Sequence, residues 1–429
     1  MNRQDATSHD ATGAETLCSN YLPTAPSTDQ RKASIVQHAV VRHGEVTRLM
    51  LMVTPEGHGS LPEQVAEALQ AIRTTLDSQP ISMQPTVQTA FLKNASDQAA
   101  CEYLFAEHYR KAGPVTTFVH QPPCNGAALA IELCAVGGPA VRLGRPAPGT
   151  LVVSHHGISM IYCGGVATVC DAGRVYEKSL DAFNQMETKL GKAGVTFDRV
   201  MRTWLYLGDI TGSEGKLERY MELNRARTDF FQDLHFGQDH LLDDTREGIY
   251  PASTGIGMDG TGVVMNCVAV DTQRRDVFLQ PIENPQQTPV YHYEAVYSPK
   301  SPKFSRAMAL VADGTGTVWI SGTASIVNSK TVHVGDPRRQ TEQTIENIKC
   351  LISADNLARH GIAGSGAKLS DVAGLRVYVK YPEHYPVCRA VCEQRFGNVP
   401  IIYTVAGVCR SDLLVEMEGI AYVKRATID

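Results

Sequence analysis

Two glutamates stand two residues apart in "CRSDLLVEMEG", residues 409–419. Leu413, Val415 and Met417 alternate with their neighbours in the period-2 pattern of a β-strand. Side chains two apart on a strand share a face, so Glu416 and Glu418 should point the same way, about 7 Å apart. Burial and a like-charge neighbour both raise a carboxyl pKa, so that the group exchanges protons near neutral pH. The pair favours acid/base chemistry at Glu416, with a solvated strand edge as the alternative.

The strand that carries this pair closes one of three similar units. In each unit apolar strands are followed by an amphipathic helix, a strand, a second helix and closing strands. The sequence therefore predicts an α+β fold of three βαβα units in tandem, packed as a pseudo-trimer with ligand clefts between neighbours. The expected boundaries are a disordered tail at 1–32, a diverged first unit at 33–148, a second unit at 149–285 and a C-terminal catalytic unit at 286–429.

Within these units the sequence also predicts individual helices, and the closing strands can be compared with one another. Helices are expected at 61–76, 97–113, 180–194, 218–231 and 386–397, and one that begins at Asp336 as N-cap with Pro337 at N1. When the closing strands of the three units are aligned, Glu416 falls opposite Glu132 in the first unit and Asn266 in the second. This indicates that one cleft kept the chemistry while the other two diverged.

Composition narrows the class of protein. The net charge of −5 gives no basic footprint for nucleic acid, and no apolar run approaches the length of a membrane span. The eleven cysteines are odd in number and lack a C-x-x-C pair, so we expect no disulfide framework and no metal site, and a cytoplasmic protein. Cys388 and Cys392 are expected to be buried thiols of a helix. "GIGMDG" at 255–260 is followed by a strand rather than a helix, which argues against a dinucleotide site, and Asp259–Gly260 is expected to form a hairpin turn.

Several motifs in order make the chain resemble a known family. "RTWLY", "PASTGIG", "IENP", "SPKFSRAM", "SGTASIV" and "CRSDLLVEMEG" occur in the order seen in chorismatases, over roughly residues 140–425. The resemblance implies the fold of the RidA/YjgF proteins and cleavage of chorismate with release of pyruvate, without a cofactor. It implies a small-molecule substrate, while the charge and hydropathy described above argue against a nucleic-acid or membrane partner. The chain itself is expected to be a monomer, or a homo-oligomer such as a trimer.

The resemblance also assigns roles to individual residues. The residues that it singles out are the catalytic Glu416, the substrate-binding Arg227, Arg389 and Tyr206, and the product-sorting Cys409 and Gly322. Cysteine combined with glycine at the last two positions resembles members that form 3-hydroxybenzoate. Gly407 departs from the family pattern, which has an acid there. Because Arg227 and Arg389 belong to second helices of different units, they can meet only across a cleft between units.

Alternatives remain open from the sequence alone. Water attack would give a dihydroxycyclohexadiene carboxylate, and mixed 3- and 4-hydroxybenzoate is a further outcome. Cys409 could shape the pocket, belong to the core or act as a nucleophile. A RidA-like enamine or imine deaminase would need an arginine near Ile401, where none stands. A non-catalytic ligand-binding protein is the remaining class.

Overall fold

The computed structural model describes residues 16–17, 34–110, 113–168, 173–237, 240–241, 248–294, 299–364 and 366–428. The tail predicted at 1–32 lies outside these residues, apart from the two-residue strand β1 (Thr16–Leu17), which pairs with β2. No helix in the described ranges is long and apolar enough to cross a membrane.

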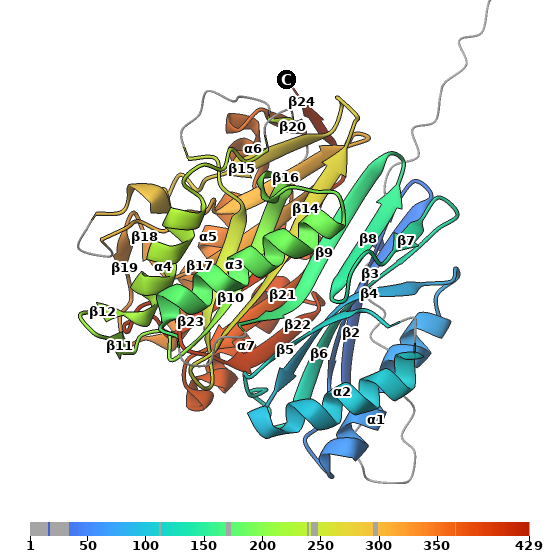
Figure 1. Cartoon of the computed structure of the whole chain (residues 1–429), viewed down its shortest axis with the longest axis horizontal. Coiled ribbons are helices and arrows are strands. Elements are labelled where there is room, and N and C mark those ends of the chain that lie inside the picture. The colour runs from blue at the N-terminus through green and yellow to red at the C-terminus, as the bar shows by residue number, and fades with distance from the viewer. Residues whose placement is uncertain are drawn as a thin grey trace, which may run out of the picture.

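Three six-stranded sheets form the framework, one for each unit (Figure 1). Their strand orders are β1-β2-β3-β6-β4-β5, β13-β10-β14-β9-β8-β7 and β15-β16-β17-β23-β21-β22. In each sheet the strand after the first helix pairs antiparallel with the closing strand and parallel with the strand after the second helix. The tandem α+β prediction is thus confirmed.

The elements of the first unit are β2 (Ile35–His43), β3 (Val46–Thr54), α1 (Leu61–Asp77), β4 (Gln84–Leu92), α2 (Gln98–Tyr109), β5 (Val115–Val119) and β6 (Leu129–Gly137). Those of the second are β7 (Arg142–Gly144), β8 (Thr150–His155), β9 (Ile158–Ala167), α3 (Val175–Lys192), β10 (Val200–Gly208), β11 (Ser213–Glu214), β12 (Leu217–Glu218), α4 (Arg219–Phe230), β13 (Ala252–Met258) and β14 (Val263–Thr272).

The third unit contains β15 (Phe278–Ile282), β16 (Ala307–Ala312), β17 (Thr315–Ala324), β18 (Ile326–Val327), β19 (Lys330–Thr331), α5 (Pro337–Leu351), α6 (Ala354–Arg359), β20 (Ile362–Gly364), β21 (Val372–Val379), α7 (Tyr385–Phe396), β22 (Ile401–Val405), β23 (Val415–Val423) and β24 (Ala426–Ile428). Two strands lie across the predicted boundaries. β7 already belongs to the second sheet and β15 to the third, so both units begin several residues before 149 and 286.

Local sequence signals explain where helices begin. Asp336 accepts a hydrogen bond from the backbone N–H of Arg339 at 3.0 Å and precedes Pro337, as predicted. At the start of α1 the Glu63 carboxylate accepts from the backbone N–H of Ser60 at 2.7 Å. Cys388 and Cys392 are fully buried in α7, as expected of structural thiols.

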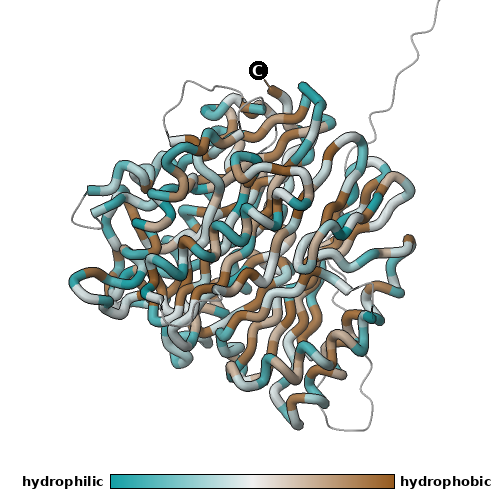
Figure 2. Tube along the Cα trace, viewed as in Figure 1, coloured by the Kyte–Doolittle hydropathy of each residue, from teal (hydrophilic) through white to brown (hydrophobic). Residues whose placement is uncertain are grey.

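Each sheet buries both of its faces. The outer face packs against the two long helices of its own unit, which gives three separate apolar cores. The inner face packs against the other two sheets, and two further apolar clusters contain residues of all three units. Apolar residues accordingly run along the strands, while apolar and polar residues alternate along the helices (Figure 2). Positions between the sheets are therefore buried even where they carry charge.

One predicted turn differs from the structure. Asp259 and Gly260 do join two strands, as the sequence indicates, but β13 and β14 do not form a hairpin. They lie on either side of β10, with β13 parallel and β14 antiparallel to it. The strand that follows "GIGMDG" excludes the helix that a dinucleotide-binding fingerprint requires.

Candidate functional site

A cleft of about 310 Å³ lies between the second and third units. One wall comes from α4 and β13, the other from β17, β23 and the loop before β23, and the segment between β15 and β16 closes one side. The backbone N–H of Ser253 in β13 donates to the hydroxyl of Ser321 in β17 at 2.9 Å, which holds the walls together. The residues that line the cleft include Glu218, Tyr220, Asn224, Tyr293, Phe304, Arg306, Gly322, Cys409, Arg410, Asp412 and Glu416.

Glu416 projects from β23 into this cleft and is 4% exposed. Burial, and next the charge of Glu418, raise the pKa of its carboxyl group to about 8, while Arg306 and Arg202 oppose the rise. A Cβ atom at position 322 would collide with Oε1 of Glu416, so the absent side chain of Gly322 makes room for the carboxyl group. A protonated acid therefore faces the cleft at neutral pH.

Glu418 lies on the same face of β23, as expected, but in a different environment. Its carboxylate accepts hydrogen bonds from Arg202, Tyr378, Thr254 (2.5 Å) and Arg376 (3.1 Å). Burial opposes ionisation, but the charges of Arg202 and Arg376 outweigh it and lower the pKa of Glu418. Two neighbouring carboxyl groups thus have opposite protonation states, which is the arrangement of an acid/base pair.

Cys409 lines the cleft close to Glu416. Burial, reinforced by the charge of Glu416, raises the pKa of its thiol to about 12, against the opposing charges of Arg410 and Arg306. The thiolate is the nucleophilic form, so a thiol that stays protonated is poorly suited to attack. This environment favours the interpretation that Cys409 shapes the pocket.

Arg306 and Arg410 supply the positive charge of the cleft. The Arg306 guanidinium donates to the Tyr293 hydroxyl at 2.6 Å and to the Thr288 carbonyl at 3.2 Å, and its Nε has no partner among the described residues. Arg410 donates to the Ser329 carbonyl at 2.8 Å. Both guanidinium groups lie near the Tyr293 ring, at 5.7 and 5.2 Å from its centroid.

Glu283 lies behind Arg306. Its carboxylate accepts from the backbone N–H of Arg306 at 3.3 Å, and burial raises the pKa of Glu283 to about 7, although Arg306 lowers it. Arg306 thus has a partly ionised carboxyl group behind it rather than a strong ion pair, which leaves its charge available to the cleft.

Arg227 lies behind the wall of the cleft and does not line it. It is 1% exposed and donates to Asn224 Oδ1 at 2.5 Å and to Ser253 Oγ at 3.4 Å, both of which do line the cleft. A hydrogen bond also joins it to Tyr220. Arg227 therefore orients polar groups of the wall.

The structure places Arg389 and Tyr206 away from the cleft, contrary to the expectation for both. Arg389 is on the outer side of α7, 42% exposed in its side chain, where it pairs with Glu393 at 2.7 Å. Its helix faces the core of the third unit, so it does not meet Arg227. Tyr206 is fully buried on β10 and accepts from Arg376 at 2.7 Å, within the network around Glu418.

The alignment of the closing strands was wrong by two residues. Counted from equivalent bulges, Glu132, Asn266 and Glu418 occupy the same place in the three sheets, opposite Thr89, Trp204 and Arg376. Ala130 and Val264 are then the equivalents of Glu416. A slip of two residues keeps every side chain on its face, so hydrophobic alternation cannot detect it. The conclusion that one cleft retains the acid is strengthened, because neither equivalent position holds an acid.

Sequence reasoning missed both arginines of the cleft. Arg306 stands within "SPKFSRAM" and Arg410 within "CRSD", so the motifs contained them, but nothing in the spacing distinguished them from other arginines. Across the described ranges, no group of three or more histidine, cysteine, aspartate or glutamate side chains is arranged to hold a metal ion.

Comparison with known proteins identifies the family. Residues 149–269 match the family model described as chorismatase FkbO/Hyg5-like, N-terminal. The chain is 36% identical over 277 residues to a 3-hydroxybenzoate synthase of Streptomyces hygroscopicus, covering 63% of this chain and 76% of the relative. It is 33% identical to a chorismatase of Streptomyces rapamycinicus, covering 62% and 78%.

Solved structures agree with the sequence relatives. A crystal structure of a chorismatase superposes with a TM-score of 0.61 at 25% identity, covering 79% of this chain and 93% of that one. A RutC family protein of Pyrococcus abyssi is 27% identical over 132 residues, which cover 30% of this chain and 96% of that protein. The chain belongs to the chorismatase family.

Proposed function

We propose that this chain converts chorismate to 3-hydroxybenzoate and pyruvate. The observation that carries the proposal is a protonated Glu416 facing a cleft that also presents Arg306 and Arg410. Chorismate is a dianion with a cyclic diene, so its site needs cationic donors for two carboxylates and an acid for the enol ether. Guanidinium groups suit this task because they bind carboxylates in planar, bidentate geometry.

Glu416 first acts as the acid. Its proton passes to the methylene carbon of the enolpyruvyl group, which converts the ether side chain into a pyruvate leaving group. Both arginines hold carboxylates of the substrate and so fix the methylene group near the acid. Arg227 supports this step indirectly by orienting Ser253 and Asn224.

Glu416 then acts as the base. The ionised carboxylate removes the proton of the 4-hydroxyl group, and the hydroxyl oxygen attacks ring carbon 3 as the bond from that carbon to the ether oxygen breaks. Pyruvate leaves with the ether oxygen, and the epoxide formed on the ring opens and aromatises to 3-hydroxybenzoate. The proton returned to Glu416 restores the acid, and substrate and products balance without water or an oxidant.

Exclusion of water decides the product. If water instead attacks the activated side chain, the ring is released as a dihydroxycyclohexadiene carboxylate. The Cys409 thiol borders the cleft beside Glu416, where an apolar, protonated side chain displaces water. Cys409→Ala is therefore expected to keep pyruvate release and raise the share of the diene-diol.

The cleft is complete within one chain, because the second and third units supply both of its walls. We therefore propose that a single chain suffices for catalysis.

The test is incubation of the purified chain with chorismate and no added cofactor, with pyruvate and ring products resolved by chromatography. Wild type should release pyruvate and 3-hydroxybenzoate in equal amounts, and Glu416→Gln should lose at least about 100-fold in rate, as expected for loss of a general acid/base. Glu383→Gln, at an exposed position, is the matched control. Absence of turnover in wild type would overturn the proposed reaction, and an active Glu416→Gln would overturn the role of Glu416.

A further inference from the structure

Asn224 lies on the second-unit wall of the cleft, and only one half of its side-chain amide has a partner. The residue is fully buried, and its Oδ1 accepts from Arg227 Nη2 at 2.5 Å. A guanidinium can only donate, so the oxygen of the amide must face Arg227 and the nitrogen must face the other way. That nitrogen has no partner among the described residues, although Asn224 lines the cleft.

Arg227 fixes two further groups of this wall. It donates to Ser253 Oγ at 3.4 Å, which also accepts from the Thr203 hydroxyl at 2.8 Å, and it is hydrogen-bonded to the Tyr220 hydroxyl. Burial raises the pKa of Tyr220, so this hydroxyl keeps its proton. Both hydroxyl oxygens accept from Arg227, which leaves their own protons for another acceptor. The wall therefore presents neutral donors to the cleft.

The charge behind these donors has no counter-ion. Arg227 forms no ion pair with a carboxylate in the described part of the chain, and its Nε has no hydrogen-bond partner there. A positive charge that is buried without a partner favours an anion on the far side of the groups that it orients.

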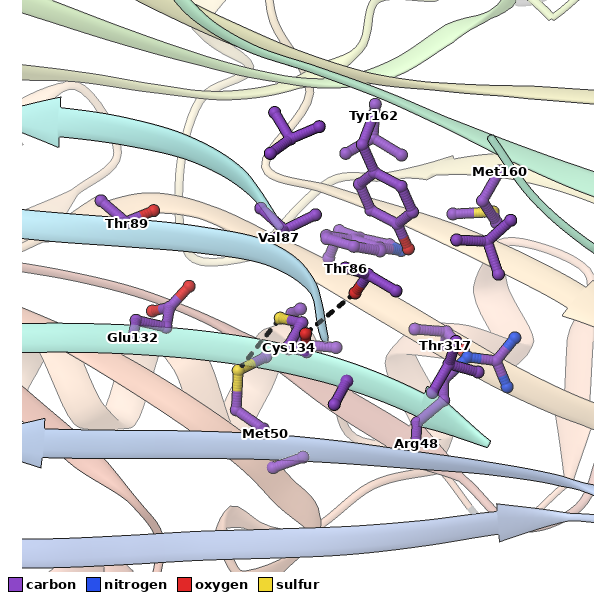
Figure 3. Close-up of a pocket in the computed structure, with 18 of the residues that line it drawn as sticks. Arg48, Met50, Thr86, Val87, Thr89, Glu132, Cys134, Met160, Tyr162 and Thr317 are labelled. Atoms are coloured by element: carbon purple, nitrogen blue, oxygen red, sulfur yellow. Dashed lines mark hydrogen bonds between the residues drawn. The ribbon is translucent and has the colours of Figure 1, made fainter. Parts of the chain in front are cut away.

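The internal cavity of about 100 Å³ where the three sheets meet shows how buried polar groups are usually satisfied (Figure 3). There the Thr86 hydroxyl donates to the Cys134 carbonyl at 2.9 Å, and the Cys134 thiol donates to the Met50 sulfur at 3.5 Å. Buried N–H groups are normally paired in the same way, because leaving one unpaired is unfavourable. The free amide nitrogen of Asn224 therefore indicates an acceptor that comes from outside the chain.

Arg306 lies at the same end of the cleft as this wall. The Phe304 ring lines the cleft, and its centroid is 5.4 Å from Cζ of Arg227 and 5.9 Å from Cζ of Arg306. A carboxylate has two oxygens with about four acceptor positions. One carboxylate beside Phe304 can thus bond to Arg306 of the third unit and to Asn224 of the second.

We propose that Asn224 binds the ring carboxylate of the substrate through its amide N–H, and that Arg227 is the residue that positions it. The inference rests on the function proposed above, since that reaction supplies a ring with a carboxylate. The epoxide intermediate keeps this carboxylate after pyruvate has left, so the contact holds the ring in the cleft until it aromatises. A buried donor whose orientation is already fixed suits this task because little side-chain freedom is lost on binding.

The contact also makes the site selective for a carboxylate over a carboxamide, because an amide nitrogen would meet the Asn224 nitrogen donor to donor. Isothermal titration calorimetry with 3-hydroxybenzoate and 3-hydroxybenzamide tests this selectivity. Wild type should bind the acid at least about tenfold more tightly than the amide. Asn224→Asp keeps an oxygen for Arg227 and turns the remaining donor into an acceptor. It should weaken binding of the acid about 10- to 100-fold and bind the amide at least as tightly as wild type does.

Two further variants separate the contact from general effects. Asn398→Asp, at an exposed position, adds the same charge and should leave both affinities unchanged. Asn224→Leu is similar in size and adds no charge, so it should reduce the preference for the acid without improving the amide. It also serves as the second variant if melting curves show that Asn224→Asp folds poorly.

These titrations need no turnover, so they separate the inference from the proposed reaction. If wild type cleaves chorismate but both Asn224 variants keep the preference of wild type for the acid, the contact is wrong and the reaction stands. If chorismate is not cleaved and Asn224→Asp still reverses the preference, the reaction is wrong and the contact stands. Absence of saturable binding of 3-hydroxybenzoate to wild type would also overturn the contact.

Discussion

Replacing Glu416 by glutamine should stabilise the protein, and increasingly so as the pH rises. The carboxyl group has a pKa of about 8 in the folded chain against an ordinary value of 4.5. When folding raises the pKa of a carboxyl group, the group does not weaken the folded state as long as the pH stays below its pKa in the unfolded chain. Between the two values the unfolded chain loses the proton and the folded chain keeps it, so stability falls by about 1.4 kcal/mol for each pH unit.

The magnitude follows from these two pKa values. The penalty carried by Glu416 is about 1.4 kcal/mol at pH 5.5 and about 4 kcal/mol at pH 7.5, a difference of about 2.5 kcal/mol. Glutamine cannot ionise and so carries no such penalty. With about 2.1 cal/mol/K of unfolding entropy per residue, a chain of 429 residues has about 0.9 kcal/mol/K in total. The gap in melting temperature between variant and wild type should therefore widen by about 3 °C.

Calorimetry of both proteins at pH 5.5 and 7.5 measures this gap. The pH dependence of the melting temperature that comes from other titrating groups is common to both proteins and cancels in the difference. Glu383→Gln, on the surface, controls for the change of side chain. A gap that stays constant between the two pH values would refute the reasoning, because it would mean that Glu416 ionises in the folded chain as it does in the unfolded one.

Four further outcomes are expected. Activity measured as kcat/KM should fall as the pH rises through about 8, because the acid form of Glu416 is required; a profile flat from pH 7 to 10 would contradict this. Gly322→Ala should reduce kcat at least about tenfold at unchanged helix content, since the new methyl group occupies the place of the Glu416 carboxyl group. Full activity would mean that the strand shifts to make room for the methyl group. Arg376→Met should lower the unfolding free energy by about 3–5 kcal/mol in urea titrations, because two buried carboxylates lose their partner; a loss below about 1 kcal/mol would speak against the network. Arg389→Gln should leave KM for chorismate within about twofold of wild type, whereas Arg306→Gln should raise it at least about tenfold, and the reverse order would restore the family-based assignment.

The fold was largely predictable because its signals are local. Helix periodicity, the Asp336–Pro337 start and the alternation of the closing strands each depend on a few adjacent residues, and all three agree with the structure. The unit boundaries were less accurate. β7 and β15 are short edge strands whose assignment to a sheet depends on pairing with residues outside their own segment.

The site was predictable only in part. Glu416, Cys409 and Gly322 come together in one cleft as expected, since they lie in or beside neighbouring strands of a single unit. The arginines of the cleft were not predictable in this way. Arg227, Arg306, Arg389 and Arg410 look alike in the sequence, and which of them reaches the cleft depends on how the second unit packs on the third.

By itself, the sequence determined three repeated units, the shared face of Glu416 and Glu418, and the resemblance to chorismatases. Only the tertiary structure decided that these two acids differ. Arg202 and Arg376 come from other strands to hold Glu418 ionised, while at Glu416, which faces the cleft, burial and the charge of Glu418 outweigh the charges of Arg306 and Arg202. The physical reason is that strand periodicity fixes the direction of a side chain, whereas its pKa depends on burial and on charges that distant segments bring within reach.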